Sequence, residues 1–454
     1  MFNSYHSTNC CIILALTYTT AIADIALHII KIRLLHTGSV KVYAVLIAAL
    51  IAGGAVTVLA SLFYYPFQPN PLQYRIVSES IDNNPVPVVF ENTTNLTNNP
   101  MDSVYGQVAA WNNNVYMLWQ DSVPPGYRNY DIFIKSSNDN GTTFGSDINL
   151  SNNPGFSEHP QIAAYDNNVY AIWADDASGN REVLFARSED NGTSFDEIKN
   201  LSNNTSDSFN QEIAVYGDNV YVVWLDQGQG ANTNILLRVS SDGGATFGRT
   251  VNISSNANRE TFPKVAAYEG SIYIAWNMLP ENPDQVDNSG LFFVRSSDAG
   301  NTFDNVIKLN RENAFGELQI AAFNDTVYVV SGGLHTLNVN DIFFTKSVDG
   351  GRSFSESVTI DENNAIFANP LNVEVSAYND QFSYIATQAS ISGNEEILLL
   401  EVTGDNSAPV TNLSNNPKIS ECPSIAMAAD NIYVVWEDMT PGNHEILYAK
   451  GVRA

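Results

Sequence analysis

Seven residues of the chain have types that could act together on a ligand. They are three arginines, two tyrosines, a glutamate and a histidine: Arg128, Arg181, Arg259, Tyr127, Tyr130, Glu158 and His159. Converging guanidinium groups can clamp a carboxylate through paired hydrogen bonds. Exposed arginines are also common in loops that bind nothing, so a solvated surface is the alternative. The sequence predicts a binding site here only if the fold brings these segments together.

Two further sets of polar residues recur at fixed positions. Four aspartates each stand two residues after a tryptophan: Asp121, Asp175, Asp226 and Asp438. A ring of carboxylates could hold a divalent cation such as calcium, but capping of a loop explains the same spacing and is the interpretation we favour. We expect no cofactor, and the six histidines show no metal-ligand spacing.

The second set begins a repeated apolar run in each unit of the sequence. Its members are Gln107, Gln161, Glu212, Lys264, Gln319, Glu374 and Ser424. They could line a polar channel suited to sugars or peptides. A solvated channel wall without a ligand is the alternative.

The elements that must position these residues come from a repeat of about fifty residues. Similar phrases end at Trp119, Trp173, Trp224, Trp276, Ser331, Ala386 and Trp436, with intervals of 54, 51, 52, 55, 55 and 50 residues. A constant period of this size, built from short β-branched and aromatic runs, is typical of a β-propeller. The sequence therefore predicts an all-β fold of seven blades, with the tryptophans packed between neighbouring blades.

Each repeat predicts one blade of four strands. In the second repeat the strand signals cover 160–165, 168–173, 182–188 and 194–202. The seventh repeat ends after its third strand, while residues 86–100 resemble the fourth strand of other repeats. We therefore expect the N-terminal strand to complete the last blade and to close the ring, which hides an otherwise unpaired edge.

Five repeats carry the pattern S-x-D-x-G-x-[ST]-F between the third and fourth strands. Its aspartates are Asp139, Asp190, Asp242, Asp298 and Asp349. Such an aspartate can accept hydrogen bonds from its own loop, and the glycine two places on permits a positive φ. The pattern resembles the Asp-box, and residues 86–454 resemble the Asp-box (BNR-repeat) propellers, of which sialidases are the best known. That resemblance implies a structural role for the boxes, which lie away from the active site in enzymes and in binding propellers alike.

The same resemblance implies what a sialidase would need. Family sialidases use three arginines, a tyrosine nucleophile paired with a glutamate, an aspartate acid/base and an F/Y-R-I-P signature on a six-bladed ring. Residues 74–77 read YRIV, which lacks the proline and precedes the first blade. Box turns share a rim with the turns between first and second strands, so any site is expected on the opposite rim, where the connections are longer and more varied.

The N-terminal segment predicts a membrane anchor. Residues 42–65 carry no charge and would span a bilayer as a transmembrane helix. Because Lys31, Arg33 and Lys41 precede them, residues 1–41 are expected in the cytoplasm and the propeller outside. A cleaved secretory signal is the alternative. Residues 66–85, with four prolines, read as a linker to the propeller at 86–454.

The net charge and the glycosylation sequons limit the classes of partner that we expect. The net charge is −28, and a surface so acidic repels phosphate backbones, so no nucleic acid is expected as a partner. Eleven N-x-[ST] sequons follow residue 90 and agree with an exported glycoprotein; the glycosylation candidates include Asn92, Asn95, Asn149, Asn200, Asn252 and Asn412.

Taken together, the sequence predicts an extracellular, cell-surface propeller that binds a glycan or a protein without catalysis. It would be attached to the cell membrane by a single pass, or secreted after cleavage of the signal. The alternatives are a sialidase-like exo-glycosidase and a structural component of the cell envelope.

Overall fold

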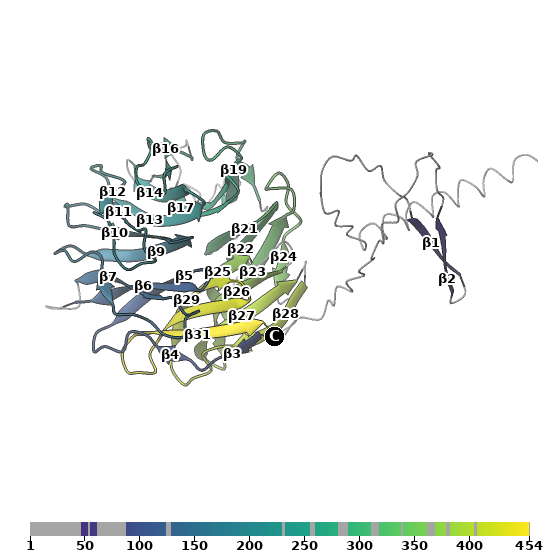
Figure 1. Ribbon diagram of the computed structural model, residues 1–454. Coiled ribbons are helices and arrows are strands. Elements are labelled where there is room, and N and C mark those ends of the chain that lie inside the picture. The colour runs from purple at the N-terminus through teal and green to yellow at the C-terminus, as the bar shows by residue number, and fades with distance from the viewer. Residues whose placement is uncertain are drawn as a thin grey trace, which may run out of the picture. The chain divides into compact units, whose positions relative to one another are not determined.

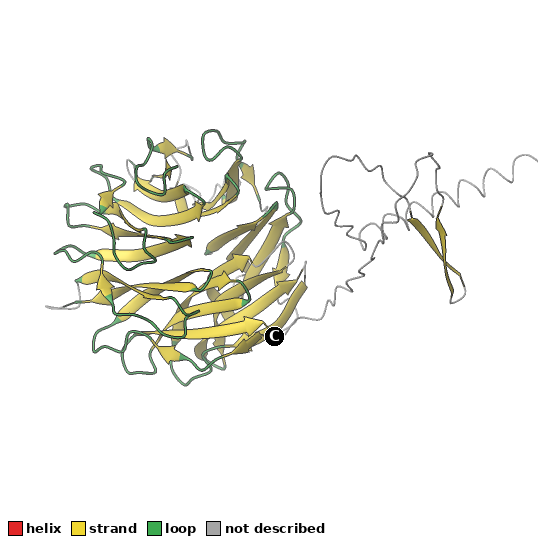
Figure 2. Ribbon diagram, viewed as in Figure 1, coloured by secondary structure: helices red, strands yellow, loops and turns green. Residues whose placement is uncertain are grey.

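The computed structural model describes twelve segments of the chain: 47–52, 55–60, 88–123, 129–228, 232–254, 259–279, 289–309, 317–336, 339–360, 368–377, 382–403 and 406–453. Two compact units are present, Met1–Ile81 and Asp82–Ala454. Every regular element among the described residues is a β-strand (Figure 2).

The larger unit is a ring of seven antiparallel sheets, which confirms the predicted seven-bladed propeller (Figure 1). Blade 1 holds β5 (Ser103–Trp111), β6 (Asn114–Ser122), β7 (Tyr130–Ser137) and β8 (Ile148–Asn149). Blade 2 holds β9 (Ser157–Tyr165), β10 (Asn168–Asp175), β11 (Glu182–Ser188) and β12 (Lys199–Asn200). Blade 3 holds β13 (Ser208–Tyr216), β14 (Asn219–Gln227), β15 (Thr233–Ser240) and β16 (Val251–Asn252).

The remaining blades follow the same order. Blade 4 holds β17 (Arg259–Tyr268), β18 (Ser271–Leu279), β19 (Gly290–Ser296) and β20 (Ile307–Lys308). Blade 5 holds β21 (Leu318–Phe323), β22 (Thr326–Thr336), β23 (Val339–Ser347) and β24 (Val358–Ile360). Blade 6 holds β25 (Ala368–Ala377), β26 (Phe382–Ile391), β27 (Asn394–Thr403) and β28 (Asn406–Asn412). Blade 7 holds β29 (Ser420–Ala428), β30 (Asn431–Asp438) and β31 (Glu445–Arg453), completed by β3 (Val88–Phe90) and β4 (Thr94–Asn95).

Ring closure follows the prediction. Strand β3 pairs antiparallel with β31, with Val88 opposite Arg453 and Phe90 opposite Gly451, and β4 pairs with the other end of β31. The N-terminal strand therefore completes the last blade. Strands β3 and β4 thus cover the edge of β31 that would otherwise be unpaired.

The core is divided among the boundaries between blades. Each of seven hydrophobic clusters joins two neighbouring blades, and the one between blades 7 and 1 includes Tyr433 and Val115. The five repeat tryptophans are at most 1% exposed, as predicted. Each such side chain stabilises the fold by roughly 2–3 kcal/mol of apolar burial.

The fourth strands are shorter than predicted. Residues 194–202 were expected as a strand, but only Lys199–Asn200 pair as β12. The box turn is the reason, because its hydrogen bonds occupy residues that would otherwise extend the hairpin. Blade 6 supports this explanation: its box has decayed to VTGDNSAP, and β28 runs for seven residues from Asn406 to Asn412.

The smaller unit differs from the expected transmembrane helix at 42–65. Its described residues form two strands, β1 (Ile47–Ala52) and β2 (Ala55–Ala60), which pair antiparallel. Between them the sequence is Gly53-Gly54, and a glycine pair between β-branched runs favours a two-residue hairpin, a signal that a count of uncharged residues misses. In the part of the chain that the structure describes, no helix has the length and hydropathy that a membrane crossing needs.

Candidate functional site

One rim of the propeller carries the box turns, and all five use the same hydrogen bonds. In blade 3, the Ser240 hydroxyl donates to Asp242 at 2.7 Å, and the Thr246 backbone N–H donates to the same carboxylate at 2.8 Å. The Gly244 N–H donates to Ser240 at 2.9 Å, with Gly244 at φ +80°. Gly243 N–H also donates to the Asp218 carbonyl in the turn between β13 and β14. The boxes therefore share the rim that was predicted for them.

These aspartates are exposed yet strongly hydrogen-bonded. Hydrogen bonds from the side chain and backbone of Ser194, Thr246 and Thr302 hold the pKa of Asp190, Asp242 and Asp298 at about 2. The same contacts hold the pKa of Asp139 and Asp349 well below the usual value. Each carboxylate is directed into its own turn, so the five do not converge on a common site.

Two arginines of the third strands, Arg187 and Arg295, fasten neighbouring blades. Arg187 in blade 2 contacts Asp196 at 2.7 Å and donates to the Gly243 carbonyl in the box of blade 3 at 3.1 Å. Arg295 in blade 4 binds the Gly350 carbonyl in the box of blade 5 in the same way. The box rim is thus a fastening surface between blades.

The aspartates two residues after the tryptophans cap loops, as we favoured. Asp438 accepts from Trp436 Nε1 at 3.1 Å, from Asn416 Nδ2 at 2.7 Å and from the Ser420 hydroxyl at 2.8 Å. Asp121, Asp175 and Asp226 each bind the corresponding asparagine. Each of these aspartates therefore ties the second strand of its blade to the connection that leads into the first strand of the same blade.

Several sequons have a structural origin. Asn95, Asn149, Asn200 and Asn412 each accept, through Oδ1, a hydrogen bond from the backbone N–H three residues on. The serines of three of these sequons accept from the third strand; Ser202, for example, accepts from the Val183 N–H at 2.9 Å. Asn92 and Asn252 are exposed. Glycosylation of the six candidates stays a prediction.

The opposite rim carries a second ring of residues with unusual backbone geometry. Each lies two positions before a predicted channel residue and has a positive φ of 49–53°: Tyr105, His159, Asn210, Phe262, Asn372 and Cys422. Pairing with the second strand shifts register at these places, which marks a β-bulge in each of these six blades. Bulges re-aim side chains, and strained non-glycine residues cluster at ligand sites.

The predicted channel residues come together inside this ring. Gln161 Nε2 donates to Glu212 at 3.3 Å, and Lys264 forms an ion pair with the same carboxylate. Gln319 donates to Glu374 in the next blade. The Ser424 hydroxyl donates to Gln107 at 3.3 Å and closes the set between blades 7 and 1. The polar channel wall therefore consists of three hydrogen-bonded groups, to which each of the seven blades contributes one residue.

Burial shifts the ionisation of this wall. Burial, and to a smaller extent the neighbouring carboxylates, raise the pKa of Glu374 to about 8, although Lys264 opposes the shift. Burial alone would lower the pKa of Lys264, but Glu212 and Glu374 together outweigh it and raise that pKa. Lys264 therefore stays charged, while Glu374 is neutral below about pH 8.

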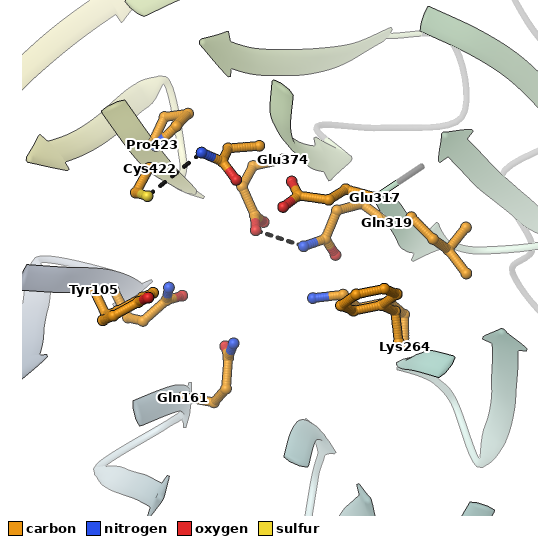
Figure 3. Close-up of a pocket in the computed structure, with 12 residues that line it drawn as sticks. Tyr105, Gln161, Lys264, Glu317, Gln319, Glu374, Cys422 and Pro423 are labelled. Atoms are coloured by element: carbon orange, nitrogen blue, oxygen red, sulfur yellow. Dashed lines mark hydrogen bonds between the residues drawn. The ribbon is translucent and has the colours of Figure 1, made fainter. Parts of the chain in front are cut away.

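The two rings enclose a pocket of about 160 Å³, which we call the channel cup (Figure 3). It is lined by Tyr105, Gln107, Gln161, Phe262, Lys264, Glu317, Leu318, Gln319, Asn372, Glu374, Cys422 and Pro423. Six blades contribute, so the cup lies on the axis of the ring. Tyr105 is 40% exposed and Phe262 is 46% exposed. Two partly exposed aromatic side chains thus line the cup together with amides, carboxylates and one amine.

Part of the arginine and tyrosine set from the sequence lies beside the cup. Arg181 Nε binds Glu158 Oε1 at 2.8 Å, and His159 stacks edge-to-face on Tyr105 with ring centres 4.6 Å apart. Tyr130 packs against Phe156 in blade 1 instead of the cup. Because Arg181 already holds a carboxylate of the protein, it is not an open clamp.

The other members of that set are not tested by the structure. Tyr127 and Arg128 lie outside the described residues, and Arg259 is described only as part of the backbone of β17. Conversely, sequence reasoning missed Tyr105 and Phe262. Their signal was present, because each is an aromatic residue two places before a channel position where other repeats hold His, Asn, Glu or Cys.

Comparison with known proteins supports the fold and leaves the activity open. No protein-family model and no curated protein matches the chain. The solved polysaccharide lyase Uly1 aligns with a TM-score of 0.52 at 10% identity, covering 76% of this chain and 89% of the lyase. A Dyadobacter fermentans protein of unknown function aligns with 0.51 at 13% identity, covering 81% and 99%.

A Trypanosoma rangeli sialidase in complex with sialic acid aligns at a TM-score of 0.47 and 12% identity. The alignment covers 67% of this chain and spans 55% of the sialidase's length. At this score the likeness carries no argument, and at these identities the two better alignments show a shared fold alone.

Proposed function

We propose that this protein binds a carbohydrate in the channel cup and does not cleave it. The observation that carries the proposal is the pair of exposed rings, Tyr105 and Phe262, over a floor of hydrogen-bonding side chains. Aromatic faces stack on the apolar faces of sugar rings, while amides and carboxylates bind hydroxyl groups; this is the usual division of labour in a ligand pocket. The shared fold with a polysaccharide lyase agrees with this ligand class.

The charge of the cup restricts the ligand. Among the described residues around it, Lys264 is the cation and Glu212, Glu317 and Glu374 are carboxylates. Lys264 is already paired with Glu212, so the set offers an anionic sugar no free cation, whereas a neutral or positively charged sugar needs none. The cup therefore supports neutral glycans or amino sugars as ligands over sialic acid.

The second candidate remains a sialidase-like exo-glycosidase of the Asp-box family. Glu158, Arg181 and His159 beside Tyr105 are the residues that favour it. Because Arg181 is already paired with Glu158, it is not free to bind the carboxylate of a substrate. A protein ligand for the same rim, or a purely structural role in the envelope, are the further alternatives.

For location, we propose that the apolar segment 42–65 brings the propeller to the outer face of the cell membrane, as an anchor or as a cleaved signal. The proposal rests on the uncharged length of the segment and on Lys31, Arg33 and Lys41 before it. Fractionation of cells with a protease-accessibility assay tests it. Protection of the propeller inside intact cells would contradict it.

The experiment for the function uses the full-length chain in mild detergent. We would screen it on a glycan array that contains neutral, amino and sialylated sugars, and in parallel on fluorogenic glycosides. The expected result is retention of neutral or amino sugars without release of the fluorophore. Turnover of any glycoside would overthrow the binding-only proposal, and selective retention of sialylated glycans would overthrow the charge argument.

A further inference from the structure

Blade 7 brings one histidine and two glutamates together beside the channel cup. Glu421 lies in β29, Glu437 in β30, and His444 directly precedes β31. His444 Nδ1 is 3.6 Å from Glu437 Oε2 and 3.8 Å from Glu421 Oε1. One ligand atom from each residue lies within 4.8 Å of the others. We infer that this cluster is a binding site for a divalent transition-metal ion, of which Zn²⁺ fits best.

The nitrogen of His444 gives the first reason. Nδ1 is fully buried and makes no hydrogen bond in the part of the chain that the structure describes. A buried polar atom without a partner is costly, so such atoms usually face a ligand or an ion. Here Nδ1 is directed at two carboxylates and has the lone pair that a metal ion needs.

The charge on Glu437 gives the second reason. Its side chain is only 5% exposed, and Oε1 accepts the Tyr105 backbone N–H at 2.7 Å. The other oxygen faces His444, and Glu421 and Asp102 add like charge nearby. In the part of the chain that the structure describes, no lysine or arginine pairs with Glu421 or Glu437, and a bound cation would compensate their charge.

Blade 2 provides a matched contrast within the same chain. Strand pairing places Glu158 and Ala174 at the positions of Glu421 and Glu437. Arg181, which precedes β11, holds the position of His444 and neutralises Glu158 at 2.8 Å. In blade 2 the protein supplies the cation, Arg181, and there is one carboxylate. In blade 7 there are two carboxylates, and a histidine, which can bind a metal ion, stands in place of the arginine.

The ligand set decides which ion fits. One imidazole nitrogen and two carboxylate oxygens suit Zn²⁺, with bonds of about 2.0–2.2 Å and ligand atoms roughly 3.3–3.6 Å apart. Calcium prefers oxygen ligands alone. The His444 distances are already close to these values, and the half-buried Glu421, 32% exposed, has room to approach. Three protein ligands would leave one position open to water.

Isothermal titration of the chelator-treated, full-length chain with ZnCl₂ tests the site. We expect about one equivalent to bind, with a rise in melting temperature, and little heat with CaCl₂. E421Q changes a partly exposed side chain and should weaken binding at least ten-fold without unfolding the blade. H444Q should do the same.

H159Q is the matched control, because His159 also lies near a glutamate, at 3.9 Å from Glu158, but the described residues offer it no third ligand. Its zinc affinity should equal that of the unmodified chain. Absence of binding would show His444 to be only the cationic partner of two carboxylates and would overturn the inference. The inference would also be overturned if E421Q and H444Q bound zinc as tightly as the unmodified chain. The same holds if the unmodified chain bound calcium as tightly as zinc.

Discussion

The two rims of the propeller use the same kind of side chain in opposite ways. On the box rim, exposed aspartates such as Asp242 accept hydrogen bonds from their own turn, and their pKa values fall to about 2. At the channel cup, Glu374 is removed from water and its pKa rises to about 8. The first arrangement stabilises ionised groups for structure. The second keeps a hydrogen-bonded carboxyl group in a buried pocket, where burial disfavours its ionised form; such shifted groups are typical of binding sites.

The rims also differ in what repeats. All five box turns use the same bonds, so residue and geometry recur together. On the opposite rim the bulge recurs, but its residue is Tyr105 in one blade, Phe262 in another and Cys422 in a third. A conserved backbone that presents varied side chains is typical of a recognition surface, whereas repetition of both is typical of a scaffold.

The strongest test of this contrast removes the two exposed rings. In Y105A/F262A, binding of the glycan that the array selects should weaken about 100-fold, because two stacking contacts worth roughly 1–2 kcal/mol each are lost. The melting temperature should change much less than the affinity, since both side chains are partly exposed and alanine makes the same demand on the backbone. Titration calorimetry measures the first effect and thermal unfolding the second. Unchanged affinity would remove the cup as the site.

The reciprocal variant changes the box rim. Ser188 is 1% exposed; its hydroxyl donates to Asp190 and accepts the Gly192 N–H at 2.9 Å. S188A leaves that N–H unpaired and should lower the free energy of unfolding by about 1–2 kcal/mol. Glycan affinity should not change, and the exposed S178A serves as the control. If S188A lost glycan affinity while S178A did not, the two rims would not have separate roles.

The fold was largely readable from the sequence, and the site was only partly so. Period and blade number follow from residues that recur at one position in five of the seven repeats, such as Trp173 and Trp224, and ring closure follows from residues 86–100, which resemble a fourth strand. The cup depends on single-blade departures such as Tyr105 and Phe262, whose importance appears only when the bulge aims them at the axis. Bulges carry no residue signature here, so their positions could not be predicted.

A smaller effect concerns pH and the cup. Because the folded pKa of Glu374 lies near 8, above its model-peptide value of 4.5, folding favours its protonated form. Stability from this group is therefore full below about pH 4.5 and declines as pH rises towards and through 8. We expect a measurable loss over this interval, and the opposing effect of Lys264 is already contained in the pKa of about 8.

Urea unfolding between pH 5 and pH 9 measures this decline. E374Q should flatten it, whereas E356Q at an exposed position should not. The difference in the free energy of unfolding between the unmodified chain and E374Q isolates this group at each pH. A difference that rises from pH 5 to pH 9 would contradict a buried, neutral Glu374.

The smallest effect has the opposite sign and belongs to the box rim. Hydrogen bonds depress the pKa of Asp190 to about 2, so its contribution to stability is present above pH 4 and is lost as pH falls through 2. D190N should reduce the acid sensitivity between pH 4 and pH 2, as followed by circular dichroism. The same slope in both proteins would mean that the box carboxylate is not linked to folding.

Hydrogen–deuterium exchange with and without a saturating glycan tests the central claim most directly, because it reports both rims in one measurement. The account predicts protection in the segments around 105–107, 262–264 and 317–319, which line the cup, and none in the box turn at 240–247. Protection confined to the box turns, or spread equally over both rims, would contradict it.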